Sequence, residues 1–391
     1  MLVLIANLGS TSYKYRLFRM DETGGEVLAK GGYERVTDYG EVIEQSLAAL
    51  ESEGAISSRD EIDAVGFKTV LGRNLSGCVE GDEEILAALD GFAAVAPAHN
   101  PPYAAGIRQF AKILPKARRV ALFETAFYQW VPEAASRYAV PRSWFEAGVR
   151  RYGFHGASHK FVAERSAELC GRDDIAEAVR RLYLDGPKDF AGAPLRVVSC
   201  HLGGSSSVTG IRNGVAAGTS MGFSPQSGLP QNNRVGDLDS GAIPFAMRTL
   251  GLSLDEVDRQ LTKESGLLGV SGVSNDVRDI AEAAEAGNTD AQLALDMLVD
   301  SILHWTGAFM AKLGGLDALV FTAGIGENRP RIRELVCTAL EPFGVALDPA
   351  KNSACMGTEQ EISTPTSKVR VFVVPANEEL VLAREVWRKV G

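Results

Sequence analysis

Two segments far apart in the chain share one pattern of apolar and polar positions. Residues 2–7 form an apolar run rich in β-branched residues, a Gly-Ser turn follows, and alternating apolar positions resume over 13–19. The same features return in the same order over 196–211. A period of two on either side of a tight turn predicts a β-hairpin in each place. Such turns expose backbone N–H groups and small hydroxyls, so the repetition suggests a duplicated domain with phosphate held between the copies.

The rest of the chain alternates short apolar runs with longer segments of helical periodicity. Further strands are expected near 26–33 and at 62–67, 118–125, 316–324 and 369–374. Helices are expected over 39–53, 82–89, 102–113, a segment ending near 170, 242–250, 254–263, 276–287, 289–313, 331–342 and the C-terminal segment. Strands mixed with helices of this length indicate an α/β fold with helices packed on a mixed sheet.

Proline- and glycine-rich segments separate these elements. Three prolines within 96–102 predict a stiff loop, and glycines mark loops over 217–241 and 324–330. Residues 184–195 are expected to form a surface loop. Ligands of open α/β sheets bind beyond the strand ends, where the unusual loops lie, so we expect a single cleft. At 391 residues the chain exceeds the usual size of one core, which favours two domains.

Composition narrows the class of protein. The apolar fraction of 45% and the charged fraction of 23% are ordinary for a globular protein. The formal net charge of −10 argues against a nucleic-acid or membrane partner, since both require a basic face. The five cysteines are scattered and read as reduced, buried residues of a cytoplasmic protein. The apolar N-terminal run ends at Asn7, too early for a signal peptide or a membrane span.

Three glycine turns at predicted strand ends are candidates for binding phosphate. Residues 7–14 combine a carboxamide, a glycine, hydroxyls and a lysine, so Asn7 is a candidate metal ligand and Lys14 a candidate phosphate contact. Residues 201–207 repeat this chemistry, and 323–330 add a turn that opens a helix, whose N-terminus favours an anion. Each turn alone is also compatible with an ordinary hairpin or loop. Neither a dinucleotide-type GxGxxG turn nor a Walker pattern is present.

Candidate basic groups lie in irregular segments. His155 and Arg234 fall in glycine-containing stretches, where a polar tip is placed at little cost. The planar fork of arginine can brace a phosphoryl group during its transfer, which lysine cannot copy. His99 and His159 are as consistent with hydrogen-bonded structural residues as with a functional site.

Two acidic residues follow predicted strands. Glu124 ends the run over 118–125, and Glu378 comes soon after a strand and a proline. Carboxylates in such places often only cap helices. Phosphoryl transfer, however, requires oxygen ligands for Mg²⁺ and positive charge beside the transferring group. Asn7 and the two glutamates would supply the oxygens, and Lys14 with the basic residues above would supply the charge.

The chain resembles the acetate kinase family through segments that occur in the family's order. They run from residue 7 to residue 380 and are NLGSTSYKY, APAHNPP, FETAFYQ, RYGFHGASH, CHLGGSSS, GTSMGFSPQSGL, RVGD, AGIGEN and PANEEL. The resemblance implies an α/β fold of two duplicated ribonuclease H-like domains of the actin/Hsp70 type, with the active site in the cleft between them. It assigns residues 1–128, joined by the C-terminal helix 380–391, to one domain and 129–379 to a nucleotide-binding domain.

The resemblance also implies a reaction. It is reversible phosphoryl transfer from ATP, bound with Mg²⁺ or Mn²⁺, to a short carboxylic acid, giving an acyl phosphate and ADP. The family implies a cytoplasmic homodimer. Two alternatives stay open: a nucleotide-binding sensor of the same fold with little or no turnover, and a kinase for an acid unlike acetate, either branched, longer or hydroxylated.

Site roles follow from the positions that match the family's motifs. The catalytic and metal-binding matches are Glu124, His155, Arg234, Asn7 and Glu378. The nucleotide-binding matches are Lys14, His201, Leu202, Gly203, Gly204, Ser205, Asp276, Val277, Arg278, Gly324, Ile325, Gly326, Glu327 and Asn328. The residues expected around the acid are Lys68, Val70, Ala98, His99, Phe154 and Pro225.

Four departures from the family's pattern matter. Glu124 stands where the family has aspartate, which moves the carboxylate out by one methylene, and Gly204-Ser205 replaces Asn-Gly. Lys68 replaces the arginine that binds the acid, so bidentate grip on a carboxylate is lost unless the nearby Arg73 supplies it. Ala98 replaces a leucine and opens space for several carbon atoms. The change at Ala98 favours an acid larger than acetate, and Lys68 together with Ala98 argues against acetate itself as the substrate.

Overall fold

The first of two sheets is built by the N-terminal part of the chain. The computed structural model describes residues 1–9, 11–22, 24–72, 75–93 and 100–391. The strands of this sheet are β1 (Leu2–Leu8), β2 (Ser12–Asp21), β3 (Gly24–Glu34), β4 (Ala64–Thr69), β5 (Cys78–Glu80) and β6 (Arg118–Phe123). They lie in the order β3-β2-β1-β4-β6-β5. β1, β4 and β6 run parallel, and β1 and β2 form the expected hairpin.

The second sheet repeats the first strand for strand. Its members are β7 (Arg196–Leu202), β8 (Ser206–Arg212), β9 (Val215–Thr219), β10 (Ala318–Thr322), β11 (Gln360–Glu361) and β12 (Arg370–Val373). The order β9-β8-β7-β10-β12-β11 has the same parallel centre, the same hairpin and the same antiparallel edges. The duplication predicted from the two hairpins is therefore confirmed.

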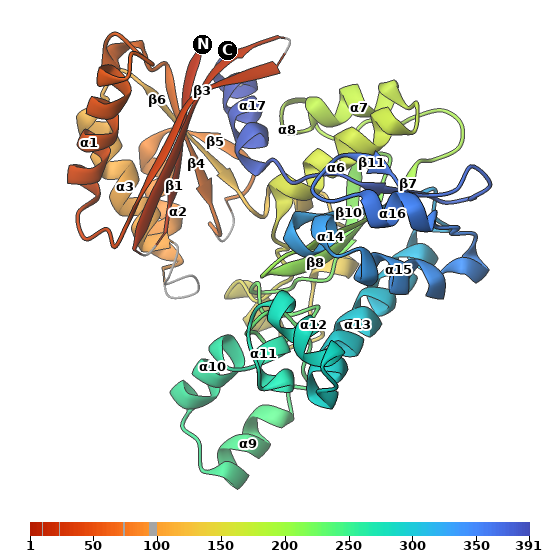
Figure 1. Ribbon diagram of the computed structural model, residues 1–391. Coiled ribbons are helices and arrows are strands. Elements are labelled where there is room, and N and C mark those ends of the chain that lie inside the picture. Colours follow the sequence, from red (N-terminus) through yellow and green to blue (C-terminus); the bar gives the residue numbers. More distant parts are fainter. Residues whose placement is uncertain (10, 23, 73–74, 94–99) are drawn as a thin grey trace.

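Helices cover both sheets (Figure 1). They are α1 (Tyr39–Ser52), α2 (Asp82–Gly91), α3 (Asn100–Ile113), α4 (Glu133–Ser136), α5 (Arg142–Glu146), α6 (Gly156–Leu169), α7 (Asp173–Arg180), α8 (Leu182–Asp185), α9 (Ala242–Leu250), α10 (Leu254–Lys263), α11 (Gly266–Ser271), α12 (Val277–Glu285), α13 (Thr289–Leu313), α14 (Ala323–Asn328), α15 (Pro330–Ala339), α16 (Pro349–Ala354) and α17 (Glu378–Val390). Short 3₁₀ turns occur at Arg59–Glu61, Ala126–Tyr128 and Glu341–Phe343. No helix in the described ranges is both long and apolar enough to cross a bilayer.

Alternation along β1 divides its side chains between two cores. Leu4 and Leu8 join the apolar cluster under α1, α2 and α3, whereas Val3 and Ile5 pack with α17. A strand covered on both faces needs apolar residues at every position, which explains the nearly unbroken apolar run. The same packing brings the last helix of the chain back to the first sheet, and the two termini lie side by side (Figure 1).

Four expected loops differ from the structure. α3 already begins at Asn100 and carries Pro101 and Pro102 in its first turn, where the missing N–H groups need no helical partner. Residues Ala323–Asn328 form α14 directly after β10 instead of an open loop. β9 occupies the start of the segment expected to be a glycine-rich loop, because it pairs with β8. α8 reaches two residues into the surface loop expected at 184–195.

Candidate active site

The ends of the parallel strands of the first sheet place a lysine between two carboxylates. Lys68 lies at the end of β4, and Glu124 directly follows β6, where its backbone N–H donates to the Thr69 carbonyl at 2.8 Å. Lys68 Nζ is 2.7 Å from Glu124 Oε1 and 2.5 Å from Glu378 Oε2. Glu378 is the first residue of α17. The three side chains therefore form one ion cluster, although they come from three separate segments.

The two carboxylates of this cluster differ in their surroundings. Glu124 is only 6% exposed, and its Oε2 has no hydrogen-bond partner within the described ranges. Burial by itself would raise the pKa of Glu378, but the charge and hydrogen bond of Lys68 together with the neighbouring His201 outweigh it and leave that pKa below its usual value. Both glutamates thus present carboxylate oxygens to the same small region. One of these oxygens, Glu124 Oε2, is buried and has no hydrogen-bond partner among the described residues.

Asn7 and Lys14 face each other across the β1–β2 hairpin. The Asn7 side-chain oxygen accepts a hydrogen bond of 2.9 Å from the Tyr103 hydroxyl, at the same sheet edge as Glu124. Lys14 is exposed and pairs with Glu34 at 3.5 Å. Among the residues that the structure describes, no group of three or more His, Cys, Asp or Glu side chains is arranged to hold a metal. A cation here would therefore be held by two glutamates and a carboxamide.

Three histidines cluster beside this edge, and two of them, His155 and His201, are stacked. The rings of His155 and His201 lie 4.0 Å apart, centroid to centroid, at 19°, and His159 is 6.0 Å from His201. His155 Nδ1 and His159 Nε2 both contact the Ser207 hydroxyl, at 2.9 and 2.8 Å. Burial lowers the pKa of all three imidazoles, that of His201 to about 4 although the charge of Glu378 opposes it, and the other two histidines, Lys68 and Arg234 lower the pKa of His155 further. Neutral rings are therefore the state at neutral pH.

A close backbone contact joins the histidines to the carboxylates. The Gly156 N–H donates to the Glu124 carbonyl at 2.9 Å, and a Cβ on Gly156 would lie 2.3 Å from that oxygen. Only glycine allows this approach. The preceding residue, His155, has φ = 59°, a left-handed conformation that costs a non-glycine residue about 1–3 kcal/mol. The contacts of His155 with Ser207 and of Gly156 with the Glu124 backbone hold this conformation at the start of α6.

Arg234 lies on the other side of the histidines, in the loop before α9. Its Nη1 is 3.3 Å from Gln231 Oε1 and 3.5 Å from Ser205 Oγ, and burial lowers the pKa of its guanidinium. The loop packs closely against α11, as shown by the 2.1 Å that would separate a Cβ added at Gly266 from the Gln231 carbonyl. Ser205 therefore contacts Arg234 of this loop.

A cavity of about 370 Å³ lies beside the second sheet. It is lined by Gly203, Gly204, Asn232, Asp276, Val277, Arg278, Gly324, Ile325, Asn328 and Arg329. Eight of these were expected to bind nucleotide; Asn232 and Arg329 were not. Asp276 accepts a 2.8 Å hydrogen bond from the Arg278 N–H, and the bonds from Arg278 lower its pKa to about 2. Ala323, with φ = 65°, is a second strained residue and opens α14 at this cavity.

The expected wall of the acid pocket is partly assembled. Val70 and Phe154 belong to one apolar cluster with Leu71, Phe92, Tyr152, Met221 and Phe223, which joins the ends of β4 and α2 to the second half of the chain. The five additional members went unnoticed in the sequence, since isolated apolar residues carry no local signal. Pro225 was also expected in this wall but is not a member of the cluster; its carbonyl accepts a 2.6 Å hydrogen bond from the Gln231 side chain. Ala98, His99 and Arg73 lie outside the described residues.

Six expected nucleotide contacts do not line the cavity, namely Lys14, His201, Leu202, Ser205, Gly326 and Glu327. Leu202 is buried at the end of β7. The Gly326 carbonyl accepts from the buried Arg333, and Glu327 accepts a 2.9 Å hydrogen bond from the Ala376 N–H. Glu327 therefore supports the segment that leads to Glu378. His201 lies in the histidine stack, and these assignments to nucleotide binding stay predictions.

Comparison with known proteins identifies the family. The profile of the acetokinase family matches residues 33–384. The chain belongs to the acetokinase family. It is 40% identical to the acetate kinase of Oceanobacillus iheyensis, covering 100% of this chain and 98% of that one, and 41% identical to that of Dictyoglomus thermophilum over the whole of both.

Solved structures of the acetokinase family share the fold. The acetate kinase of Porphyromonas gingivalis superposes with a TM-score of 0.89 at 37% identity over the full length of both chains. A propionate kinase from Francisella tularensis gives a TM-score of 0.86 at 30% identity over 98% of both. This acetokinase-family chain is an enzyme, a phosphotransferase with a carboxyl group as acceptor, on two duplicated actin/Hsp70-type domains.

Proposed function

We propose that this acetokinase-family enzyme transfers the γ-phosphoryl group of ATP reversibly to a short carboxylic acid, which is acetate, propionate or a somewhat larger acid. The observation that carries the proposal is that His155 and Arg234 contact Ser207 and Ser205, two residues apart in the chain, and that Lys68 of the ion cluster is close enough to lower the pKa of His155. In the forward step an acid oxygen forms a bond to the γ-phosphorus. The bond from that phosphorus to the bridging oxygen breaks, and ADP leaves with the electron pair. No proton or electron has to be supplied.

The chain's own residues would position this reaction. Lys68 would attract the acid's carboxylate, and the apolar cluster around Phe154 would receive its tail and exclude water. Neutral His155, whose Nδ1 is held by Ser207, would offer its other ring nitrogen to the transferring phosphoryl group. Arg234 would place a fixed positive charge beside the same group. Catalysis of phosphoryl transfer depends mainly on such electrostatic stabilisation.

The nucleotide and its cation fit the residues that are present. The 370 Å³ cavity, which two glycine-bearing segments line, would receive ATP or ADP, and Lys14 would contact the phosphates. Asn7, Glu378 and the unpaired Oε2 of Glu124 would hold Mg²⁺ or Mn²⁺, since hard divalent cations take a few protein oxygens and fill the rest with water and phosphate. The bound cation would neutralise phosphate charge.

The organisation of the molecule supports three further parts of the proposal. We assign 1–128 with 380–391 to one domain and 129–379 to the other, because α17 packs on the first sheet. We propose a homodimer formed through exposed apolar side chains on α9, α10 and α13, which are Phe245, Leu250, Leu254, Leu293 and Met297. The five cysteines are free thiols, which supports a cytoplasmic location.

A hydroxylamine trap for acyl phosphate tests the activity. The enzyme is incubated with MgATP and a panel of acids from one to six carbons. We expect product with at least one acid, and a preference for acids larger than acetate would agree with the departures at positions 68 and 98. If ATP binds but no acid gives product, the protein is a nucleotide sensor on this fold and the proposal fails.

A further inference from the structure

A network of hydrogen bonds connects the second sheet with His155. Ser199 lies on β7 and Ser207 on β8, and both side chains are fully buried. His159, on α6, lies between them: its Nδ1 is 2.8 Å from Ser199 Oγ, and its Nε2 is 2.8 Å from Ser207 Oγ. Ser207 Oγ is also 2.9 Å from His155 Nδ1. These four side chains form one unbranched series, which we call the serine–histidine network.

Regular periodicities place these side chains together. His155 and His159 are four residues apart, one turn of helix, and the His159 N–H donates to the His155 carbonyl at 3.0 Å. Ser207 lies opposite His201 in the register of β8 with β7, and Ser199 is two residues before His201. Because side chains alternate along a strand, these three strand residues share one face of the sheet, which α6 covers.

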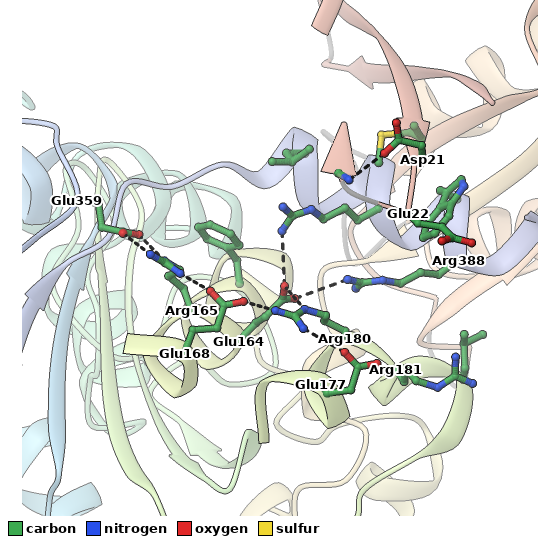
Figure 2. Close-up of a pocket in the computed structure, with 17 residues that line it drawn as sticks. Asp21, Glu22, Glu164, Arg165, Glu168, Glu177, Arg180, Arg181, Glu359 and Arg388 are labelled. Atoms are coloured by element: carbon green, nitrogen blue, oxygen red, sulfur yellow. Dashed lines mark hydrogen bonds and ion pairs between the residues drawn. The ribbon is translucent and has the colours of Figure 1, made fainter. Parts of the chain in front are cut away.

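Ion pairs hold α6 in place beyond the two histidines. Glu164 on this helix accepts a 3.2 Å hydrogen bond from Arg180 of α7, and Arg384 of α17 lies 3.6 Å from it. Arg165 pairs bidentately with Glu359 at 2.8 Å. Figure 2 shows these charged side chains as a row from Glu359 to Glu164. The helix is thus tied to three other segments, which favours a single placement of its histidines.

The hydrogen bonds of the serine–histidine network can point in only two ways. Ser207 has one hydroxyl proton and an imidazole on either side, so it donates to one ring and accepts from the other. In the first direction Ser199 donates to His159 Nδ1, and the Nε2–H of His159 donates to Ser207. Ser207 then donates to His155 Nδ1. In the second direction each of these hydrogen bonds is reversed.

The burial of Ser199 favours the first direction. Among the described residues, the Ser199 hydroxyl has no hydrogen-bond partner except His159. In the second direction it would accept from His159, and its own proton would be buried without an acceptor, which folded proteins avoid. In the first direction every polar proton between Ser199 and His155 has an acceptor. His155 Nδ1 then accepts, so the neutral ring carries its proton on Nε2.

We propose that Ser199, His159 and Ser207 are positioning residues, which fix His155 as the tautomer with a proton on Nε2. No described residue forms a hydrogen bond with this Nε2, so a ligand can reach it. A phosphoryl oxygen accepts from an N–H, whereas the other tautomer would direct a lone pair at the same negatively charged group. Only the meeting of Nε2 with the phosphoryl group rests on the proposed function; the tautomer itself does not.

Nitrogen NMR of the full-length protein, labelled with ¹⁵N-histidine, tests the tautomer. The protein has only five histidines, and the signals of His155 are those that disappear in His155→Asn. Protonated and unprotonated imidazole nitrogens differ widely in chemical shift. At neutral pH and without ligands, we expect His155 to be protonated on Nε2 alone. A proton on Nδ1, or on both nitrogens, overturns the proposal.

Ser199→Ala tests the network at a distance, because Ser199 does not contact His155. Without its hydroxyl, either direction leaves His159 Nδ1 unpaired, so the signals of His155 should move toward an average of the two tautomers. Unchanged signals overturn the proposal. The matched control is Ser166→Ala, since Ser166 is equally buried on α6 but its hydroxyl donates to the Ala163 carbonyl; the His155 signals should not move. If melting curves show that Ser199→Ala does not fold, Ser199→Cys, with a weak donor, replaces it.

Kinetics test whether the tautomer matters for the reaction. Ser207→Ala removes the donor to His155 Nδ1, and we expect kcat to fall about tenfold while the dissociation constant of MgADP stays the same. Ser207→Thr keeps the hydroxyl and should recover most of the rate. A wild-type kcat in Ser207→Ala, or a loss confined to MgADP affinity, overturns the positioning role. If the wild type phosphorylates no acid, the proposed function fails, and the NMR experiment still decides the tautomer.

Discussion

Lys68 and Glu378 are 310 residues apart in the chain, yet Lys68 Nζ lies 2.5 Å from Glu378 Oε2. The same ammonium group touches Glu124 at 2.7 Å. One cation therefore lies between two carboxylates at the point where the two halves of the molecule meet, and one positive with two negative charges leaves the cluster with a formal charge of −1. The two glutamates hold the lysine in place, and a lysine cannot bind the acid's carboxylate in the bidentate way of an arginine.

The first prediction concerns this lysine. Lys68→Met leaves two carboxylates facing each other without a cation and removes the attraction for the acid. We expect kcat/KM for the acid to fall by about 10- to 100-fold, the usual effect of losing a charge-assisted hydrogen bond. Lys68→Arg keeps the charge and should retain most of the activity. Steady-state kinetics on all three proteins decide the matter, and Lys68→Met with wild-type kinetics would show that the lysine has no role in the reaction.

Arg234 is expected to act on the transferring group rather than on nucleotide binding. Arg234→Ala should lower kcat by about a hundredfold or more while the dissociation constant of MgADP changes little, because the contact is made mainly in the transition state. Arg234→Lys should recover only part of the rate, since a point charge lacks the planar fork. A large loss of MgADP affinity in Arg234→Ala would instead place this residue in the nucleotide site.

Gly156 offers a test of the close backbone contact between the start of α6 and the Glu124 carbonyl. A methyl group at this position meets the Glu124 carbonyl at 2.3 Å, so Gly156→Ala should destabilise the protein by about 1–3 kcal/mol and reduce activity. Gly307 is the matched control, because it lies in α13 with no neighbouring atom within 4 Å of an added Cβ. Gly307→Ala should stabilise by about 0.5–1 kcal/mol. Urea unfolding measures both; equal effects of the two substitutions would contradict the packing argument.

Acid should destabilise the protein because its three buried histidines are harder to protonate in the folded state than in the unfolded chain. The folded pKa values of His155, His159 and His201 lie below the unfolded value of 6.5, so the unfolded chain binds protons first as the pH falls. Stability is therefore full above pH 6.5 and declines below it, for His201 down to about pH 4. Each buried histidine contributes about 1.4 kcal/mol per pH unit in this window.

The free energy of unfolding, measured by urea titration between pH 7.5 and 4.5, checks this slope. In His201→Asn, the slope of the unfolding free energy against pH should fall by the contribution of about one proton. The free energy of unfolding of this variant at pH 7.5 should also be lower. An identical slope in the variant and the wild type would mean that His201 is already protonated in the folded protein.

The proposed dimer predicts a specific effect of surface charge. Phe245, on α9, is 65% exposed, and Phe343, in the 3₁₀ turn before β11, is 63% exposed. Phe245→Glu should yield monomers if α9 lies in the interface, because a charge buried there has no partner. Phe343→Glu should leave the assembly unchanged. Light scattering coupled to size exclusion reports the mass of each; a monomeric wild type would contradict the proposal directly.

Much of the fold could be predicted because its signals are local. The period-two alternation and tight turns of β1–β2 and β7–β8 lie within about twenty residues each, and their repetition announced the duplicated sheet. The long helix α13 was equally plain from its periodicity. The predictions of loops at α14 and β9 were wrong because contacts with neighbouring elements, and not the local composition, determine the conformation there.

What the sequence determined by itself is the set of chemical groups: the glycine turns, the histidines, Arg234 and the glutamates that follow strands. Tertiary structure alone decided which of them meet. It placed Lys68 between two glutamates, put Asn232 and Arg329 in the wall of the 370 Å³ cavity, and brought arginines of α17 to Glu164 of α6. The physical reason is that a short-range pattern fixes the direction of a chain segment, whereas charge pairing and close packing depend on residues brought together from hundreds of positions away.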